Sequence, residues 1–133
     1  MKGSYILLME LPEEKTIQIG KLGSILFPAF WYVYVGSAMN GIASRVKRHF
    51  SEEKKHHWHI DYFLDKSQLN QAYFRESKFR EECDIAQTFA ESVTSIPSFG
   101  SSDCTCESHL FYGNKNELEE IINNIGMKKF KAK

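Results

Sequence analysis

Arg45 and His49 are the first residues in this chain whose types and spacing fit a chemical role. They lie four residues apart, in a segment where apolar residues also recur every four residues, at Ile42, Val46 and Phe50. This spacing predicts a helix with one apolar stripe. At 100° per residue, Arg45 and His49 share a face beside the stripe, where a cleft along a neighbouring sheet would lie. Hydrolysis of a phosphodiester needs an activated water, a counter-charge for the transition state and usually a metal ion. The pair is therefore a candidate phosphate site, and a solvated basic helix is the alternative.

Glu82 is a second candidate, because its carboxylate is predicted to face an apolar layer. Residues 77–91 are predicted to form a helix whose inward face consists of Phe79, Cys83, Ala86 and Ala90. Glu82 falls between Phe89 and Ala86 on this helix, whereas Glu81 and Asp84 project into solvent. An ionised carboxylate in apolar surroundings is costly unless it is paired or binds a metal. We expect either an ion pair with a buried arginine or a single-carboxylate site for a hard cation such as Mg²⁺, with water and phosphate as the other ligands.

The elements that position these residues are strands near the start of the chain and helices after them. Apolar runs between Gly and Pro residues predict strands at residues 5–11, 16–19, 30–35, 71–74 and 109–112. The first two strands are expected to form an antiparallel hairpin. A last helix is predicted to begin at a capping box of Asn114 and Glu117 and to end at Gly126, and residues 57–64 fit a helix or a strand equally. The fold class is α+β: a small, mostly antiparallel central sheet of about three main strands plus short ones, flanked by helices.

Composition indicates one soluble globular domain. The chain has 133 residues, of which 42% are hydrophobic and 26% are charged, which is enough for one core. We expect a single domain over residues 1–126 and a frayed basic tail at residues 127–133. No apolar run approaches the roughly 18 residues that cross a bilayer, and no signal peptide is evident. Three cysteines without a framework spacing favour a reducing cytoplasm.

Charge is balanced over the whole chain but not locally. The 17 Lys and Arg residues equal the 17 Asp and Glu residues, so the net charge is zero, which argues against a long DNA-binding groove. Residues 45–59 contain five Lys or Arg against two Glu, a net charge of +3, with four histidines besides. A local basic patch on a neutral protein fits a small phosphate site.

Cysteines and histidines offer a different kind of metal site. Cys104, Cys106 and His109, with Cys83 or His59 as a fourth ligand, could bind zinc. The C-x-C spacing differs from the C-x₂₋₄-C of structural zinc sites, so we expect a reduced, partly buried cysteine pair and not zinc. A second cluster consists of His56, His57, His59 and Asp61. It is either a metal site or, beside the lysines, an edge that faces a phosphate.

Two tyrosine motifs connect these residues to a known family. Tyr5 lies in the first predicted strand, and a Tyr-x-Gly motif, Tyr34 to Gly36, ends the third. Arg45 and His49 follow on the next helix. In this order the chain resembles the core of the GIY-YIG nuclease superfamily.

The resemblance implies a role for each matching residue. Glu82 is similar in position to the metal-binding glutamate of that superfamily, so it would bind one Mg²⁺ or Mn²⁺. Tyr34 or Tyr5 would activate the water, and Arg45 would hold the scissile phosphate. The implied catalytic residues are Tyr5, Tyr34, Arg45, His49 and Glu82. The residues expected to contact substrate are Gly36, Ser37, Arg48, His57 and His59.

The rest of the chain resembles a small prokaryotic branch of the superfamily. Its members carry the stretches written here as Y-V-G-S-A, R-H-F, H-W-H-I-D-Y and F-G-S-S-D-C-x-C-x-S-H-L-F-Y. Members of this branch are sometimes joined to DNA-glycosylase domains of the endonuclease III type, which implies DNA repair. Ser4 stands where the first motif usually has isoleucine or valine, and Ser37 where excision-type members have lysine. The asparagine that usually closes the site has no clear counterpart, and the candidates for it are Ser101, Ser102 and Asp103.

These observations predict a metal-dependent endonuclease that acts on DNA, with DNA and a DNA-repair protein as partners and no membrane association. Together Tyr34, Arg45 and Glu82 favour an enzyme, because a pure binder has no need for an inward carboxylate that repels phosphate. The alternative is a non-catalytic nucleic-acid-binding or repair-accessory domain, which the zero net charge and the missing asparagine favour.

Overall fold

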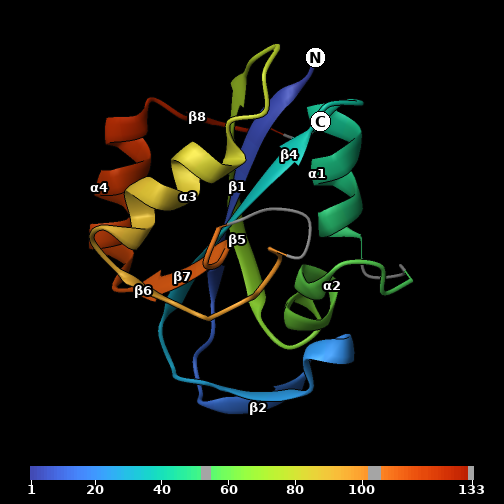
Figure 1. The fold of residues 1–133 in the computed structure, drawn as a ribbon, viewed down its shortest axis with the longest axis vertical. Coiled ribbons are helices and arrows are strands. Elements are labelled where there is room, and N and C mark those ends of the chain that lie inside the picture. Colours follow the sequence, from blue (N-terminus) through green and yellow to red (C-terminus); the bar gives the residue numbers. More distant parts are fainter. Residues whose placement is uncertain (52–54, 102–105, 132–133) are drawn as a thin grey trace.

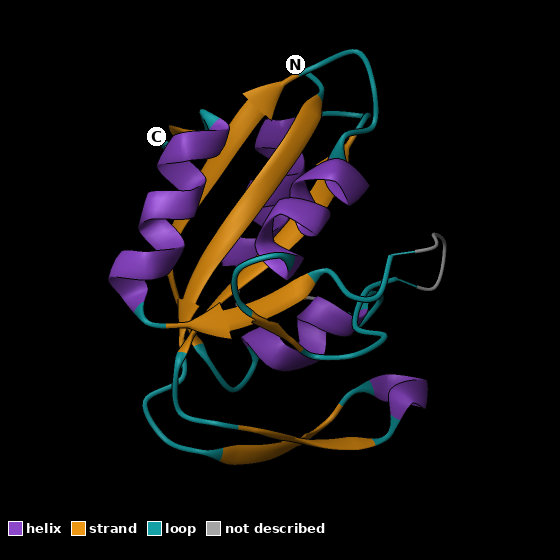
Figure 2. Cartoon of the chain, turned by 60° about the vertical axis from the view of Figure 1, so that its left-hand side comes forward, coloured by secondary structure: helices purple, strands orange, loops and turns teal. Residues whose placement is uncertain are grey.

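The fold is built on an antiparallel sheet, which has six strands in the part of the chain that the structure describes. A computed structural model describes residues 1–51, 55–101 and 106–131. Every adjacent pair of strands in the sheet runs antiparallel, and Figure 2 shows the twist of its long strands. The strand order is β6 (Thr94–Ser95), β7 (Leu110–Gly113), β4 (Trp31–Ala38), β1 (Gly3–Glu10), β5 (Gln68–Glu76) and β8 (Lys128–Lys129).

β1 lies at the centre of the sheet, which explains its unbroken apolar sequence. It pairs along its whole length with β4 on one side and with β5 on the other. Tyr5, Leu7 and Met9 belong to one layer of the core, and Ile6 and Leu8 to the other. Because both faces of the strand are covered, neither set needs to alternate with polar residues.

Helices cover both faces of the sheet, as Figure 1 shows. α1 (Ile42–Phe50) and α2 (His59–Leu64) pack on the face that carries Tyr5, and α3 (Glu82–Ala90) and α4 (Lys115–Ile125) pack on the opposite face. None of the helices in the described residues has the length and apolar character needed to cross a lipid bilayer. The α+β class with an antiparallel sheet is therefore confirmed, but the sheet has six strands and not about three.

The helices predicted to begin at Ile42 and after Asn114 are present as α1 and α4. One residue of the predicted apolar stripe of α1 is not buried. In α1, Ile42 and Val46 are fully buried, whereas Phe50, which ends the helix, is 46% exposed. At the start of α4, the side chain of Asn114 accepts a hydrogen bond of 2.8 Å from the Glu117 N–H. The helix ends at Ile125, and the next residue, Gly126, has a φ of 89°, the left-handed conformation that glycine adopts without a Cβ clash.

The predicted hairpin between the first two strands is wrong. β2 (Lys15–Gln18) pairs with β3 (Ser24–Phe27) in a separate two-stranded sheet, which lies beyond one end of the main sheet (Figure 2). Between them is a short 3-10 helix (Gly20–Leu22). The physical reason is that β4 and β5 already occupy both edges of β1. A polar break between two strands shows where a turn lies but not which strand is the partner.

The C-terminal segment is also different from the prediction, which was a frayed tail. Lys128 and Lys129 form β8 beside β5, and the Phe130 N–H donates to the Ala72 carbonyl at 2.8 Å. Met127 is 7% exposed and belongs to the core. Basic composition indicated solvent exposure, but Met127 and Phe130, on either side of the two lysines, pack against the core. Residues 132 and 133 lie outside the described residues.

α3 begins five residues later than predicted, because residues 77–81 form a loop after β5, in which the Ser77 hydroxyl accepts a hydrogen bond from the Phe79 N–H. Phe79 precedes the helix and is 76% exposed. The buried face consists of Ile85, Ala86 and Phe89. The predicted inward face, with Phe79 and Ala90, was therefore wrong except at Ala86 and the half-buried Cys83.

Candidate active site

A cleft of about 450 Å³ opens at the edge of the sheet where β7 begins, opposite Tyr34, and β4 continues beyond it. β7 pairs with β4 from Trp31 to Tyr34, and β4 runs on to Ala38. α1 packs on one face of the sheet here and α3 on the other. Of the ten residues predicted for the site, those that line this cleft are Tyr5, Tyr34, Gly36, Ser37, Arg45 and Glu82.

Gly36 lies directly opposite Tyr5 in the register of β1 and β4. The Tyr5 ring covers it so closely that a Cβ on residue 36 would be 2.5 Å from the Tyr5 Oη, which is far inside van der Waals contact. A glycine is therefore required two residues after Tyr34 if the Tyr5 ring is to reach the cleft. This contact gives the Tyr-x-Gly spacing a structural cause, whatever else Gly36 does.

His49 lies behind Tyr5, on α1. Its Nε2 is 2.7 Å from the Tyr5 Oη, and the two residues are 2% and 1% exposed. The Tyr34 ring is 6.4 Å from that of Tyr5. Burial raises the pKa of both hydroxyls well above the ordinary value for tyrosine, and the charge of Arg45 opposes this shift in each. Both tyrosines are thus neutral hydroxyls at physiological pH.

Arg45 projects from α1 into the cleft and is fixed at two points. Its Nη1 donates to the Ser37 carbonyl at 3.1 Å, and its guanidinium carbon lies 4.4 Å from the centre of the Trp58 ring. A guanidinium has five N–H donors, and the bond to Ser37 uses one of them. The arrangement presents a positive charge in a defined orientation beside Tyr5.

Glu82 enters the cleft from the opposite face of the sheet, in the first turn of α3. Its side chain is 18% exposed, and its Oε1 is 3.8 Å from Nη1 of Arg80, a side chain that is 70% exposed. The N-terminus of a helix favours a negative charge. Glu82 is the one carboxylate among the described residues that line the cleft, so it is the natural ligand there for a hard cation.

Arg48 lies on α1 beside Arg45 but is not among the residues that line the cleft. Its two terminal nitrogens donate to the two oxygens of the fully buried Asp61 at 3.0 and 3.1 Å. The same carboxylate accepts from the backbone N–H groups of His57 and Trp58. Although burial raises the pKa of Asp61, these hydrogen bonds hold it below its ordinary value. Arg48 is therefore part of a structural ion pair, and the prediction of a substrate contact is not supported by its placement.

The two histidines predicted to contact substrate, His57 and His59, also lie outside the cleft. His57 is exposed. His59 accepts a hydrogen bond of 2.9 Å at Nδ1 from the Gly100 N–H, and burial lowers its pKa. His59 thus holds the loop that carries Gly100, and it adjoins a separate hollow beside Lys21 and Leu22.

Sequence reasoning missed several residues of the cleft: Trp58, Arg80, Gly100 and His109. Trp58 and His109 occur within the long stretches that carry the family resemblance, but Trp58 was not selected and His109 was considered only as a zinc ligand. Gly100 has a φ of 70°, and its ideal Cβ position is 3.1 Å from the Tyr34 ring. Burial lowers the pKa of His109, and the charge of Glu82 opposes that shift.

A cluster that could hold a metal ion adjoins the cleft. It consists of Cys83, Cys106 and His109, which each provide one ligand atom, and these three atoms lie within 4.8 Å of one another. The predicted zinc set contained Cys104, which lies outside the described residues, as do Ser102 and Asp103, two of the candidates for the missing asparagine. The structure thus brings Cys83 to Cys106 and His109, whereas His59 bonds to Gly100.

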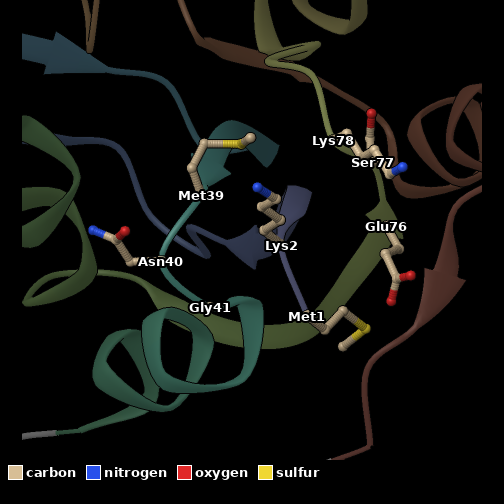
Figure 3. Close-up of a pocket in the computed structure, with 8 residues that line it drawn as sticks. All are labelled: Met1, Lys2, Met39, Asn40, Gly41, Glu76, Ser77 and Lys78. Atoms are coloured by element: carbon tan, nitrogen blue, oxygen red, sulfur yellow. The ribbon is translucent and has the colours of Figure 1, made fainter.

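A larger hollow, of about 790 Å³, lies away from the cleft and beside the N-terminal residues (Figure 3). Lys2 is near its centre, with Lys78 and Glu76 on one side and Asn40 on the other. These residues are mostly exposed, and none of the predicted site residues lines the hollow. The larger hollow is therefore a weaker candidate for an active site than the smaller cleft, because buried titratable groups indicate an active site better than volume does.

Comparison with known proteins defines the family. The model of the family described as "Domain of unknown function DUF123" matches residues 4–130. The chain belongs to this family. The match covers every element from β1 to β8, including the cleft and the cysteine–histidine cluster. No curated protein and no solved structure matches the chain.

Proposed function

We propose that this protein is a metal-dependent DNA endonuclease of the GIY-YIG kind. One observation carries the proposal: Tyr5, Tyr34, Arg45 and Glu82, which come from four different elements, line a single cleft. These are the residue types that a phosphodiester hydrolase needs for water activation, phosphate binding and metal binding. The sequence resemblance and the cleft therefore support the same function.

In the proposed mechanism, Tyr5 and His49 move a proton away from the attacking water. Because the pKa of Tyr5 is raised, its hydroxyl is protonated before the reaction and does not act as a preformed tyrosinate. Its hydroxyl lies 2.7 Å from Nε2 of His49, so Tyr5 can take a proton from water while passing its own to His49. This direction requires neutral His49 with its ring proton on Nδ1. The water attacks phosphorus as hydroxide, the phosphodiester bond breaks, and the leaving oxygen takes a proton from solvent.

Arg45 is proposed to bind the scissile phosphate. Charge-assisted hydrogen bonds from a guanidinium to phosphate oxygens can be bidentate. The contacts with Ser37 and Trp58 fix the side chain before substrate arrives, which lowers the entropy that binding would otherwise cost. The positive charge is then in place as negative charge develops on the phosphate.

Glu82 is proposed to hold one Mg²⁺ or Mn²⁺. A single, partly exposed carboxylate fits these ions, which commonly keep several waters and bind one or two carboxylates plus substrate phosphate. When bound, such an ion supplies Lewis-acid polarisation of a phosphate oxygen. In its absence Glu82 would repel a phosphate, and Arg80 would offset only part of that charge because its side chain is 70% exposed.

A second candidate function is nucleic-acid binding without cleavage. The observation that favours it is the net charge of zero, since proteins that bind DNA broadly carry a basic excess. A catalytic site needs only local positive charge at the scissile phosphate, whereas a binder needs it over a longer surface.

The decisive experiment is cleavage of plasmid, single-stranded and branched DNA with Mg²⁺ or Mn²⁺. We expect metal-dependent cleavage that falls about 10²- to 10³-fold in Arg45→Ala and by about 10²- to 10⁴-fold in Tyr5→Phe. Glu82→Gln should also lose activity and require more metal. Lys47→Ala is the matched control on α1, because Lys47 is exposed and is not among the cleft residues. Cleavage that persists in all three cleft variants would refute the proposed site. Binding without cleavage, weakened in Arg45→Ala, would favour the second function.

A further inference from the structure

Three residues with sulfur or imidazole donors meet beside the cleft. Cys83 lies in the first turn of α3, and Cys106 and His109 lie in the segment that leads into β7. Their ligand atoms are within 4.8 Å of one another, and the Cys83 Sγ is 4.0 Å from Nε2 of His109. Twenty-two residues separate Cys83 from Cys106 in sequence, so the fold, and not the sequence spacing, brings this group together.

The backbone around His109 is fixed on both sides. The His109 N–H donates to the Phe99 carbonyl at 2.8 Å, and the His109 carbonyl accepts from the Val35 N–H at 3.0 Å. The imidazole is buried, with 5% of the residue exposed. Its Nε2 is therefore held toward α3 by the sheet itself, and Cys83 is held by the helix. Two of the three ligands thus lie on rigid elements, which reduces the reorganisation needed to take up a metal.

The donor types and the distances select zinc. Tetrahedral Zn²⁺ has Zn–S bonds of about 2.3 Å and Zn–N bonds of about 2.0–2.1 Å, which places neighbouring donor atoms about 3.5–3.8 Å apart. The observed separations, up to 4.8 Å, require each donor to move by less than about 1 Å. Thiolates are poor ligands for Mg²⁺ or Mn²⁺, which prefer carboxylate, carbonyl and water oxygens. The cluster is thus chemically distinct from the oxygen ligand of Glu82.

We propose that Cys83, Cys106 and His109 bind one Zn²⁺ that fastens the segment before β7 to the start of α3. Binding releases the two thiol protons, because thiolates are the ligand form. Glu82 is adjacent to Cys83, and His109 lines the cleft, so the ion sets the distance between two walls of the cleft. Zinc on Nε2 also removes that nitrogen from proton transfer, which leaves His49 as the histidine that serves Tyr5.

The test measures metal binding and does not depend on DNA cleavage. Protein is purified from zinc-supplemented medium without metal-affinity steps. Inductively coupled plasma mass spectrometry should then find close to one zinc per chain. Replacement of the zinc by Co²⁺ should give thiolate-to-cobalt charge-transfer absorption and the visible bands of a tetrahedral ion. Cys106→Ser should lower the zinc affinity at least 10-fold and remove part of the charge-transfer band. Glu82→Gln is the control, since it should leave zinc content and the cobalt spectrum unchanged.

Either of two results would overturn the proposal: wild-type protein that binds neither zinc nor cobalt in stoichiometric amount, or a cobalt spectrum without thiolate absorption. The wild-type spectrum remains decisive even if Cys106→Ser does not fold. Circular dichroism of each variant separates loss of ligand from loss of fold. Loss of cleavage in Glu82→Gln with zinc retained would separate this site from the proposed active site.

Discussion

Asp61→Asn is expected to destabilise the protein by about 2–3 kcal/mol. The buried carboxylate accepts two hydrogen bonds from Arg48 and one each from the His57 and Trp58 N–H groups. Asparagine has the same size as aspartate, but its NH₂ group would face one of these N–H donors and could not accept a hydrogen bond from it. Removing one partner of a buried ion pair costs about 3–5 kcal/mol, and we expect a cost at or just below the lower end of that range because the Arg48 side chain is 28% exposed. With a urea slope of about 1.5 kcal/mol/M, the midpoint falls by about 1–2 M.

The assay is urea unfolding at pH 7, followed by circular dichroism. Asp65→Asn is the matched control, because Asp65 pairs with His56 at a site where both side chains are more than a third exposed, and such pairs contribute little. The pKa of folded Asp61 lies below its ordinary value. The advantage of wild type over Asp61→Asn should therefore be complete well above pH 4 and shrink as the pH falls through the folded pKa. A loss below about 1 kcal/mol at pH 7, or one that does not shrink in acid, would refute this account.

Two further predictions follow from the cleft and its supporting loop. In Gly36→Ala, the new Cβ meets the Tyr5 ring. This overpacking should lower the free energy of unfolding by about 1–3 kcal/mol and displace the Tyr5 hydroxyl from His49. An unchanged free energy of unfolding in urea would contradict this prediction. In His59→Asn, the side-chain oxygen can still accept from the Gly100 N–H but cannot titrate. Because burial lowers the pKa of folded His59, wild type should lose stability as the pH falls from about 6.5 through that lower value, and the variant should lose less. Melting temperatures at pH 7.5 and 5.5 measure this, and equal pH dependence in both proteins would disprove it.

Local patterns predicted the elements well where one face of each element decides its packing. The stripe of Ile42 and Val46 predicted α1, and the cap at Asn114 predicted the start of α4. The same patterns could not show that β2 pairs with β3, because alternation fixes which side of a strand is buried but not its neighbour. They also missed that β5 continues to Glu76, since a half-buried strand beside a charged loop has no clear sequence boundary.

The candidate site was predictable to the extent that its residues occur in recognisable motifs. Arg45 and Glu82 were selected from helical geometry as well as resemblance, and both line the cleft. Arg48 could not be judged in the same way, because its partner Asp61 lies 13 residues on and the burial of that carboxylate is a property of the tertiary fold. Cys83 was one of two possible fourth ligands proposed beside Cys106 and His109, but the sequence could not decide between Cys83 and His59, because the answer depends on how α3 and β7 pack across the sheet.

The short strand β8 has a consequence for solubility. β5 would otherwise form an outer edge of the sheet, and a long strand with free N–H and C=O groups is a template for pairing between molecules. β8 pairs with Tyr73 and Phe74, and the Phe130 N–H bonds to the Ala72 carbonyl. The lysines of β8 add charges that disfavour a further strand. β8 thus protects the protein from aggregation, and its removal would expose the unpaired N–H and C=O groups of β5 on an otherwise intact fold.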